Sequence, residues 1–169
     1  MSFRIEVEQY RALGARDPED TTTTEAIESV YSGGPEVRLI MGPQAWVRLP
    51  MSGGISDIYK SIVRMLEYIE AGVYPFEISF LSSSFTAKWL ISESSGILTI
   101  KTVWIVVDGY FNGRRIRDAR FSDAVSRIVV EKAAFVAEWQ NLAKRVKGDL
   151  LSAGYGDDLG GFEYLRTLK

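Results

Sequence analysis

The sequence of 169 residues contains no cysteine and no histidine. Without cysteine there can be no disulfide framework and no thiolate nucleophile, and without either residue the usual zinc sites are excluded. The absence of histidine also removes the side chain that most often serves as a general base near neutral pH. Any metal would have to be held by carboxylates and carbonyls. We therefore expect no catalytic residues of the common kinds, no metal site and no cofactor.

The sequence also lacks a long apolar run. No stretch approaches the ~20 residues that are needed to span a bilayer, and the first residues alternate polar and apolar instead of forming an apolar signal. We expect a cytoplasmic protein without a membrane partner. The hydrophobic fraction of 46% and the charged fraction of 25% are ordinary for a globular protein. The length favours a single domain, residues 1–169.

Hydrophobic spacing predicts the fold class. Residues 56–71 and 132–152 repeat apolar side chains at i, i+3 and i+4, as amphipathic helices do. Strands are predicted over residues 3–7, 37–41, 45–49, 76–81, 86–92, 97–107 and 124–130. Short turns join several of them, so their pairing should be antiparallel. The fold class is α+β: a mostly antiparallel sheet of about five to seven strands, packed by helices 56–71 and 132–152.

Residues 97–107 are the expected centre of the sheet. Their C-terminal half is apolar at successive positions, which is typical of a strand covered on both faces. The dipeptides Asp108-Gly109 and Asn112-Gly113 are expected to form turns with positive φ. All four tryptophans fall on predicted strands or on the apolar stripe of a predicted helix, so we expect them in the core: Trp46, Trp89, Trp104 and Trp139.

Negative charge is concentrated near the N-terminus. Between positions 17 and 37 there is no Lys or Arg, and there are six acids: Asp17, Glu19, Asp20, Glu25, Glu28 and Glu36. The net charge of the chain is −2, so the remainder carries about +4. We predict a surface loop with a short helical turn at 25–31. It serves either as a solvated connection or as a recognition loop in which the six acids meet a basic patch on a partner.

The most basic stretch is 114–120, with Arg114, Arg115, Arg117 and Arg120. It is predicted to form an edge strand, because charge commonly protects an exposed sheet edge. Clustered arginines beside Tyr110 and Phe111 could also contact a nucleic acid. The acidic overall charge and the lack of a known nucleic-acid-binding module argue against that interpretation. We treat the four arginines as a second candidate face for a protein partner.

The strand-rich middle of the chain leads through a strand into a long helix with Phe135 and Trp139, closed by Gly154-Tyr155. Over about residues 60–155 this plan resembles immunity proteins of bacterial polymorphic toxin systems, including contact-dependent growth inhibition. The resemblance is architectural and transfers no functional residues. It implies stoichiometric binding to a cognate toxin, for example a nuclease with a basic active-site face, instead of turnover.

Two other classes of function remain open. One is a small enzyme or ligand-binding protein that uses carboxylates and arginines in a pocket. The other is a phage or secretion-system structural component that self-associates. A deep polar pocket with acids of shifted pKa would favour the enzyme. A flat charged surface would favour the binding protein.

Overall fold

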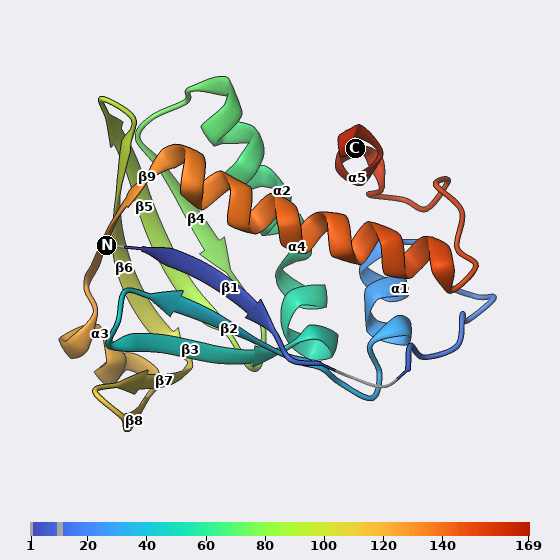
Figure 1. Ribbon diagram of the computed structural model, residues 1–169, viewed down its shortest axis with the longest axis horizontal. Helices are drawn as coiled ribbons and strands as arrows, with labels where there is room; N and C mark the ends of the chain where they lie inside the picture. The colour runs from blue at the N-terminus through green and yellow to red at the C-terminus, as the bar shows by residue number, and fades with distance from the viewer. Residues whose placement is uncertain (1, 10–11) are drawn as a thin grey trace.

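The computed structural model describes residues 2–9 and 12–169. Within them, nine strands form two antiparallel sheets (Figure 1). The five-stranded sheet has the order β1-β2-β3-β7-β8, with β1 (Phe3–Val7), β2 (Glu36–Met41), β3 (Ala45–Pro50), β7 (Asp108–Phe111) and β8 (Arg114–Arg117). The four-stranded sheet has the order β4-β5-β6-β9, with β4 (Phe76–Phe80), β5 (Thr86–Ser94), β6 (Ile97–Val106) and β9 (Arg127–Glu131).

The helices are α1 (Thr23–Val30), α2 (Ser56–Ala71), α3 (Phe121–Ala124), α4 (Lys132–Ser152) and α5 (Glu163–Thr167). The two predicted long helices are therefore confirmed, and so is the α+β class. Helix α2 ends at Gly72, whose φ of 68° allows the left-handed conformation that closes a helix. In the part of the chain that the structure describes, no helix is both long and apolar enough to cross a membrane.

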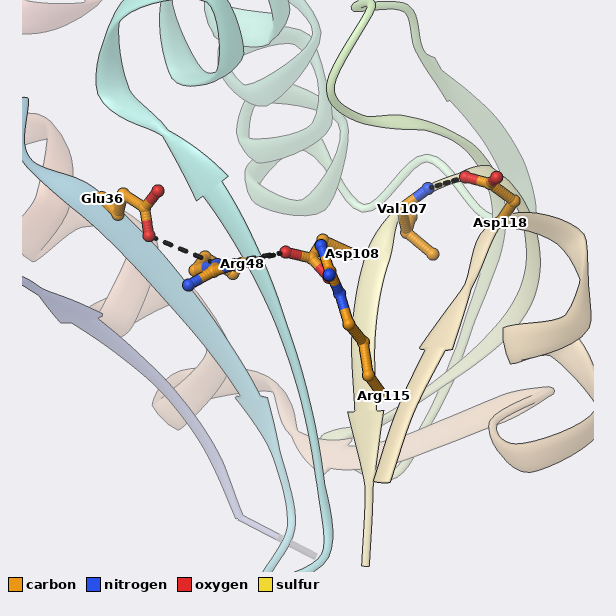
Figure 2. Close-up of polar contacts among 6 residues, drawn as sticks. All are labelled: Glu36, Arg48, Val107, Asp108, Arg115 and Asp118. Atoms are coloured by element: carbon orange, nitrogen blue, oxygen red, sulfur yellow. Dashed lines mark hydrogen bonds and ion pairs between the residues drawn. The ribbon is translucent and has the colours of Figure 1, made fainter. Parts of the chain in front are cut away.

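The strands occupy two sheets instead of the single sheet that the sequence suggests, because the chain changes sheets at Val107, between β6 and β7. The Val107 N–H donates to the Asp118 carboxylate at 3.2 Å (Figure 2). The Asp118 N–H donates in return to the Val107 carbonyl at 3.0 Å. These two hydrogen bonds hold the turn after β8 against the point where the chain crosses.

An aromatic cluster fills the space between the sheets and the long helices. Trp89 and Trp104 of the four-stranded sheet meet edge to face with ring centroids 6.0 Å apart, and Trp139 of α4 lies 6.5 Å from Trp89. Phe135 of α4 contacts Phe3 of β1 at 4.8 Å. All five side chains are buried. The cluster thus joins both sheets and α4 into one core.

Three expectations about local environment are wrong. Strand β6 buries only one face: Val103 and Ile105 point outward and are exposed. Trp46 is half-buried and lies on the outer face of the five-stranded sheet, whereas the other three tryptophans are in the core. Gly109 is not in a turn but pairs with Val47 inside β7. A Cβ there would lie 2.3 Å from the Phe121 ring, so close packing explains this glycine. The turn at Asn112-Gly113 is confirmed, with φ values of 52° and 76°.

Candidate functional site

The outer face of the five-stranded sheet carries a row of stacked aromatic and arginine side chains. Trp46 and Tyr110 are cross-strand neighbours on β3 and β7, and their rings stack at 4.0 Å with an interplanar angle of 7°. The Arg38 guanidinium lies 4.4 Å from the centroid of the Trp46 ring, and the Arg48 guanidinium lies 5.9 Å from that of Tyr110. We call these four residues the arginine–aromatic ladder. Because β3 lies between β2 and β7, both faces of the indole ring are covered.

A network of ion pairs fixes the arginines next to this ladder (Figure 2). Asp108 accepts hydrogen bonds from Arg48 at 2.8 Å and from Arg115 at 2.7 Å, one on each carboxylate oxygen. On its other side Arg48 lies 3.3 Å from Glu36. Glu36, Arg48 and Asp108 therefore follow one another across β2, β3 and β7. We call Glu36, Arg48, Asp108 and Arg115 the charged network.

The electrostatics of the charged network suit recognition better than proton transfer. Partial burial acts to raise the pKa of Asp108, but the hydrogen bonds from Arg115 and Arg48 outweigh it and hold the pKa of this carboxyl below its usual range. The hydrogen bond to Asp108 raises the pKa of Arg48. A carboxylate with a lowered pKa is a weak proton acceptor, so Asp108 is poorly suited to act as a general base. A cleft of about 460 Å³ beside the network holds Arg117 and Asp118 as further charged groups.

A larger groove of about 830 Å³ lies between α2 and α5 and has two tyrosines in its wall. Burial raises the pKa of Tyr59, whose hydroxyl donates to the Gly161 carbonyl at 3.2 Å. Burial likewise raises the pKa of Tyr164, whose hydroxyl lies 3.2 Å from the Glu70 carboxylate. Both phenols are neutral near pH 7. The Tyr164 hydrogen bond joins α5 to α2, and the Tyr59 hydrogen bond joins α2 to the segment before α5. In the described part of the chain, no group of three or more acids could hold a metal ion.

The predicted acidic loop is partly helical, and four of its six acids have internal partners: Asp17, Asp20, Glu25 and Glu36. Asp20 accepts hydrogen bonds from the hydroxyls of Tyr155 at 2.6 Å and of Ser29 at 2.7 Å. Glu25 accepts from the Thr22 hydroxyl and backbone N–H, and Thr22 in turn accepts from the Glu25 N–H, so the pair forms a capping box at the start of α1. Hydrogen bonds from Thr22 and Thr21 lower the pKa of Glu25.

The structure does not gather the six acids into one patch. Asp17 is bound through its backbone N–H to the Tyr155 hydroxyl at the end of α4, whereas Glu36 belongs to the charged network of the five-stranded sheet. Glu36 is therefore compensated by Arg48, although no Lys or Arg lies between positions 17 and 37 of the sequence. The Asp17 carboxylate accepts a local hydrogen bond from the Glu19 N–H. Of the six acids, only Glu19 and Glu28 have a carboxylate with neither a hydrogen bond nor an ion pair within the described residues.

The four arginines of the second candidate face are also divided. Strand β8 is an edge strand, as predicted, and Arg115 and Arg117 pair with Tyr110 and Asp108 across β7. Their side chains share the outer face with the ladder. Arg114 alternates to the opposite face, and Arg120 lies in the 3₁₀ turn Asp118–Arg120. The basic cluster therefore contributes two residues, not four, to the surface that Trp46 and Tyr110 form.

The sequence contains signals for two features that the prediction missed: the outward position of Trp46 and the capping box at the start of α1. Ala45, Val47 and Leu49 alternate with Trp46 and Arg48, so the period of a strand places Trp46 on the polar face. Thr22 followed three residues later by Glu25 is the pattern of a capping box. It predicts that the Glu25 carboxylate accepts hydrogen bonds at the start of the helix and does not contact a partner.

The chain was compared with protein-family models, with curated proteins and with solved structures, and none of the three comparisons found a match.

Proposed function

We propose that this chain is a non-enzymatic binding protein that docks a protein partner through the arginine–aromatic ladder, and that the partner is a toxin which the chain neutralises in a one-to-one complex. The observation that carries the proposal is the ladder itself. Tryptophan, tyrosine and arginine are the residues that most often dominate the binding energy of protein interfaces. Here Trp46, Tyr110, Arg38 and Arg48 lie side by side on an outer sheet face.

The charged network supports the same proposal. Arg48 and Arg115 are already held in place by Asp108, so they would lose little conformational entropy when a partner binds. The faces of the Trp46 ring are covered by Arg38 and Tyr110, which leaves ring edges to contact a partner. This geometry suits a protein surface better than the bases of a nucleic acid, because bases need a free ring face on which to stack. The toxin itself is inferred from architectural resemblance.

The test uses the product of the gene next to the one that encodes this chain. If that product is a toxin, the wild-type chain should inhibit it at a one-to-one ratio and elute with it as a complex. Trp46→Ala and Tyr110→Ala should each weaken the affinity by roughly 30-fold, the usual size for a residue central to an interface. Thermal unfolding of each variant shows whether it remains folded. Arg38→Gln leaves both rings in place and should weaken binding by a smaller factor.

Leu81→Ala is the matched control, because Leu81 is 72% exposed and lies outside the five-stranded sheet. It should bind like the wild type. The proposal fails if the neighbouring gene product is not inhibited, or if folded Trp46→Ala and Tyr110→Ala variants inhibit it as strongly as the wild type does. Replacing Glu19 and Glu28 by glutamine tests the competing prediction that the acidic segment binds.

A further inference from the structure

The outer face of the four-stranded sheet exposes an unusual amount of apolar surface. Eight large hydrophobic side chains are exposed among the described residues, and four of them share this face: Val103 at 54%, Ile105 at 41%, Ile97 at 40% and Leu90 at 39%. Single exposed hydrophobic residues are common on soluble proteins, whereas a contiguous group marks a site of interaction. The sheet lies on the left side of the molecule in Figure 1. One of its faces packs on the core, and the opposite face carries these exposed side chains.

Three cations are interspersed with these apolar side chains. In the register of the sheet Lys88 lies opposite Val103, and Leu90 lies opposite Lys101. Lys101 is in turn directly opposite Arg127 on β9. Cations and aliphatic side chains are therefore intermingled on three strands, on a face without any aromatic residue.

These cations have no acidic partner in the described part of the chain. None of the side chains of Lys88, Lys101 and Arg127 takes part in an ion pair or a hydrogen bond there. Glu77 and Glu131 share the face but lie on its two outer strands, β4 and β9, without pairing with the three cations. Like charges directly opposite each other on neighbouring strands oppose sheet formation. The stability of the sheet therefore does not explain why Lys101 and Arg127 occupy these opposite positions.

We infer that this face binds an acidic protein segment, whose carboxylates pair with Lys88, Lys101 and Arg127 while its aliphatic side chains cover Leu90, Val103 and Ile105. Charge complementarity decides between the possible occupants. A second copy of the chain, related by a two-fold axis, would present the same face, whose three cations outnumber its two acids, Glu77 and Glu131. Single-stranded nucleic acid would find no aromatic ring on which to stack. An acidic segment with aliphatic residues satisfies both the charges and the apolar area.

The inference does not depend on the proposed function. It concerns the four-stranded sheet, whereas the ladder lies on the five-stranded sheet, and its test uses a synthetic peptide instead of a toxin. The probe is a short synthetic peptide of glutamate and leucine, titrated into ¹⁵N-labelled protein and followed by NMR. Two matched peptides replace glutamate by lysine or leucine by serine. Vesicles of phosphatidylserine and phosphatidylcholine and a single-stranded oligonucleotide are tested in the same way.

The glutamate–leucine peptide should shift amide signals of β5, β6 and β9, while the lysine peptide should not bind. The triple variant Lys88→Gln, Lys101→Gln and Arg127→Gln should bind the probe at least about tenfold more weakly, because it loses all three ionic contacts. Val103→Thr together with Ile105→Thr should also weaken binding while keeping every charge. The control removes three exposed cations from the helices, through Lys60→Gln, Arg64→Gln and Lys144→Gln, and should leave affinity unchanged.

Several results would overturn the inference. They are the absence of binding, signal shifts outside the four-stranded sheet, and equal binding of the peptide in which serine replaces leucine. Tighter binding of vesicles or of the oligonucleotide to this face would replace the acidic segment by another partner class. Self-association that the triple glutamine variant abolishes would instead identify a second copy as the occupant.

Discussion

Each sheet places two cationic side chains directly opposite one another on its outer face, and the two pairs have different surroundings. In the five-stranded sheet Arg38 faces Arg48, and both find compensation, Arg38 over the Trp46 ring and Arg48 between Glu36 and Asp108. In the four-stranded sheet Lys101 faces Arg127 without such compensation from the described residues. Both cations of the first pair are thus compensated by described residues. On the second face the acids Glu77 and Glu131 lie on the outer strands, and neither of them pairs with Lys101 or Arg127.

This difference separates what stabilises the fold from what is available to a partner. Compensated cations contribute to the native state and hold their neighbours in fixed positions. Uncompensated cations next to exposed aliphatic side chains cost some stability, and only an added acidic partner would offset that cost. The comparison predicts that substitutions in the charged network of the first face change stability, whereas substitutions of the three cations on the second mainly change the binding of an acidic segment.

The largest effect is expected where the five-stranded sheet packs on the core. In Gly109→Ala the new Cβ would lie 2.3 Å from the Phe121 ring and 2.8 Å from the Ile116 carbonyl, so β7 and β8 must move. We expect a loss of about 2–3 kcal/mol in the free energy of unfolding, or roughly 5–10 °C in the melting temperature. NMR shifts should change around Tyr110 and Arg115 and stay unchanged around Lys101.

The same substitution at Gly148 is the control. Gly148 lies within α4, and nothing approaches its missing side chain within 4 Å. Gly148→Ala should therefore raise the free energy of unfolding by about 0.5–1 kcal/mol, since alanine is the better helix former. Equal melting temperatures for Gly109→Ala and the wild type would contradict the close packing of β7.

Gly109 also illustrates which parts of the fold the sequence can predict. Helices α2 and α4 and the strands β4, β5 and β6 follow from the spacing of nearby residues, and their predicted positions agree with the structure. The role of Gly109 depends on Phe121, and the packing between them is fixed only when the sheets come together. The exposure of Val103 has the same origin, because a strand does not encode whether a layer will cover its second face.

The candidate site was less predictable than the fold for a related reason. Charge content identified the acidic segment and the arginine cluster, but counting charges does not show which of them are compensated. Glu36 and Arg48 are 12 positions apart and meet only because β2 and β3 pair. The three cations of the four-stranded sheet come from three strands, and no single stretch of sequence displays them together.

A smaller effect is expected in the charged network. Asp108→Asn removes the negative charge from between Arg48 and Arg115, and the Asp108 side chain is only 20% exposed. We expect a loss of about 1–2 kcal/mol in the free energy of unfolding at pH 7, discounted for the solvent exposure of both arginines. Lys88→Gln, on the other outer face, should change it by less than about 0.5 kcal/mol.

The pH dependence gives an independent check on Asp108. Its pKa in the folded protein lies below the ordinary value of 3.8, so on acidification the unfolded chain takes up the proton first. The stabilisation by Asp108 is therefore fully present above about pH 4 to 5 and is lost as the pH falls through its folded pKa. Denaturation of the wild type and of Asp108→Asn should differ most near neutral pH and converge in acid. A constant difference down to pH 2 would contradict the ionic origin of the stabilisation.

The smallest effect concerns Lys101 and has the opposite sign. Lys101→Glu replaces a like-charge pair with Arg127 by an opposite-charge pair at the same register position. Opposite charges across neighbouring strands are favourable, so the free energy of unfolding should rise by about 0.3–1 kcal/mol at low salt. Added salt should shrink this gain, because it screens both the repulsion in the wild type and the attraction in the variant.

Arg38→Glu, at the corresponding pair of the five-stranded sheet, should give no such gain, since it removes the cation from the Trp46 ring. If Lys101→Glu is more stable yet no longer binds the glutamate–leucine peptide, Lys101 serves the partner at the expense of the fold. If it is less stable than the wild type, Lys101 already has compensation within the chain, and the contrast between the two faces is wrong.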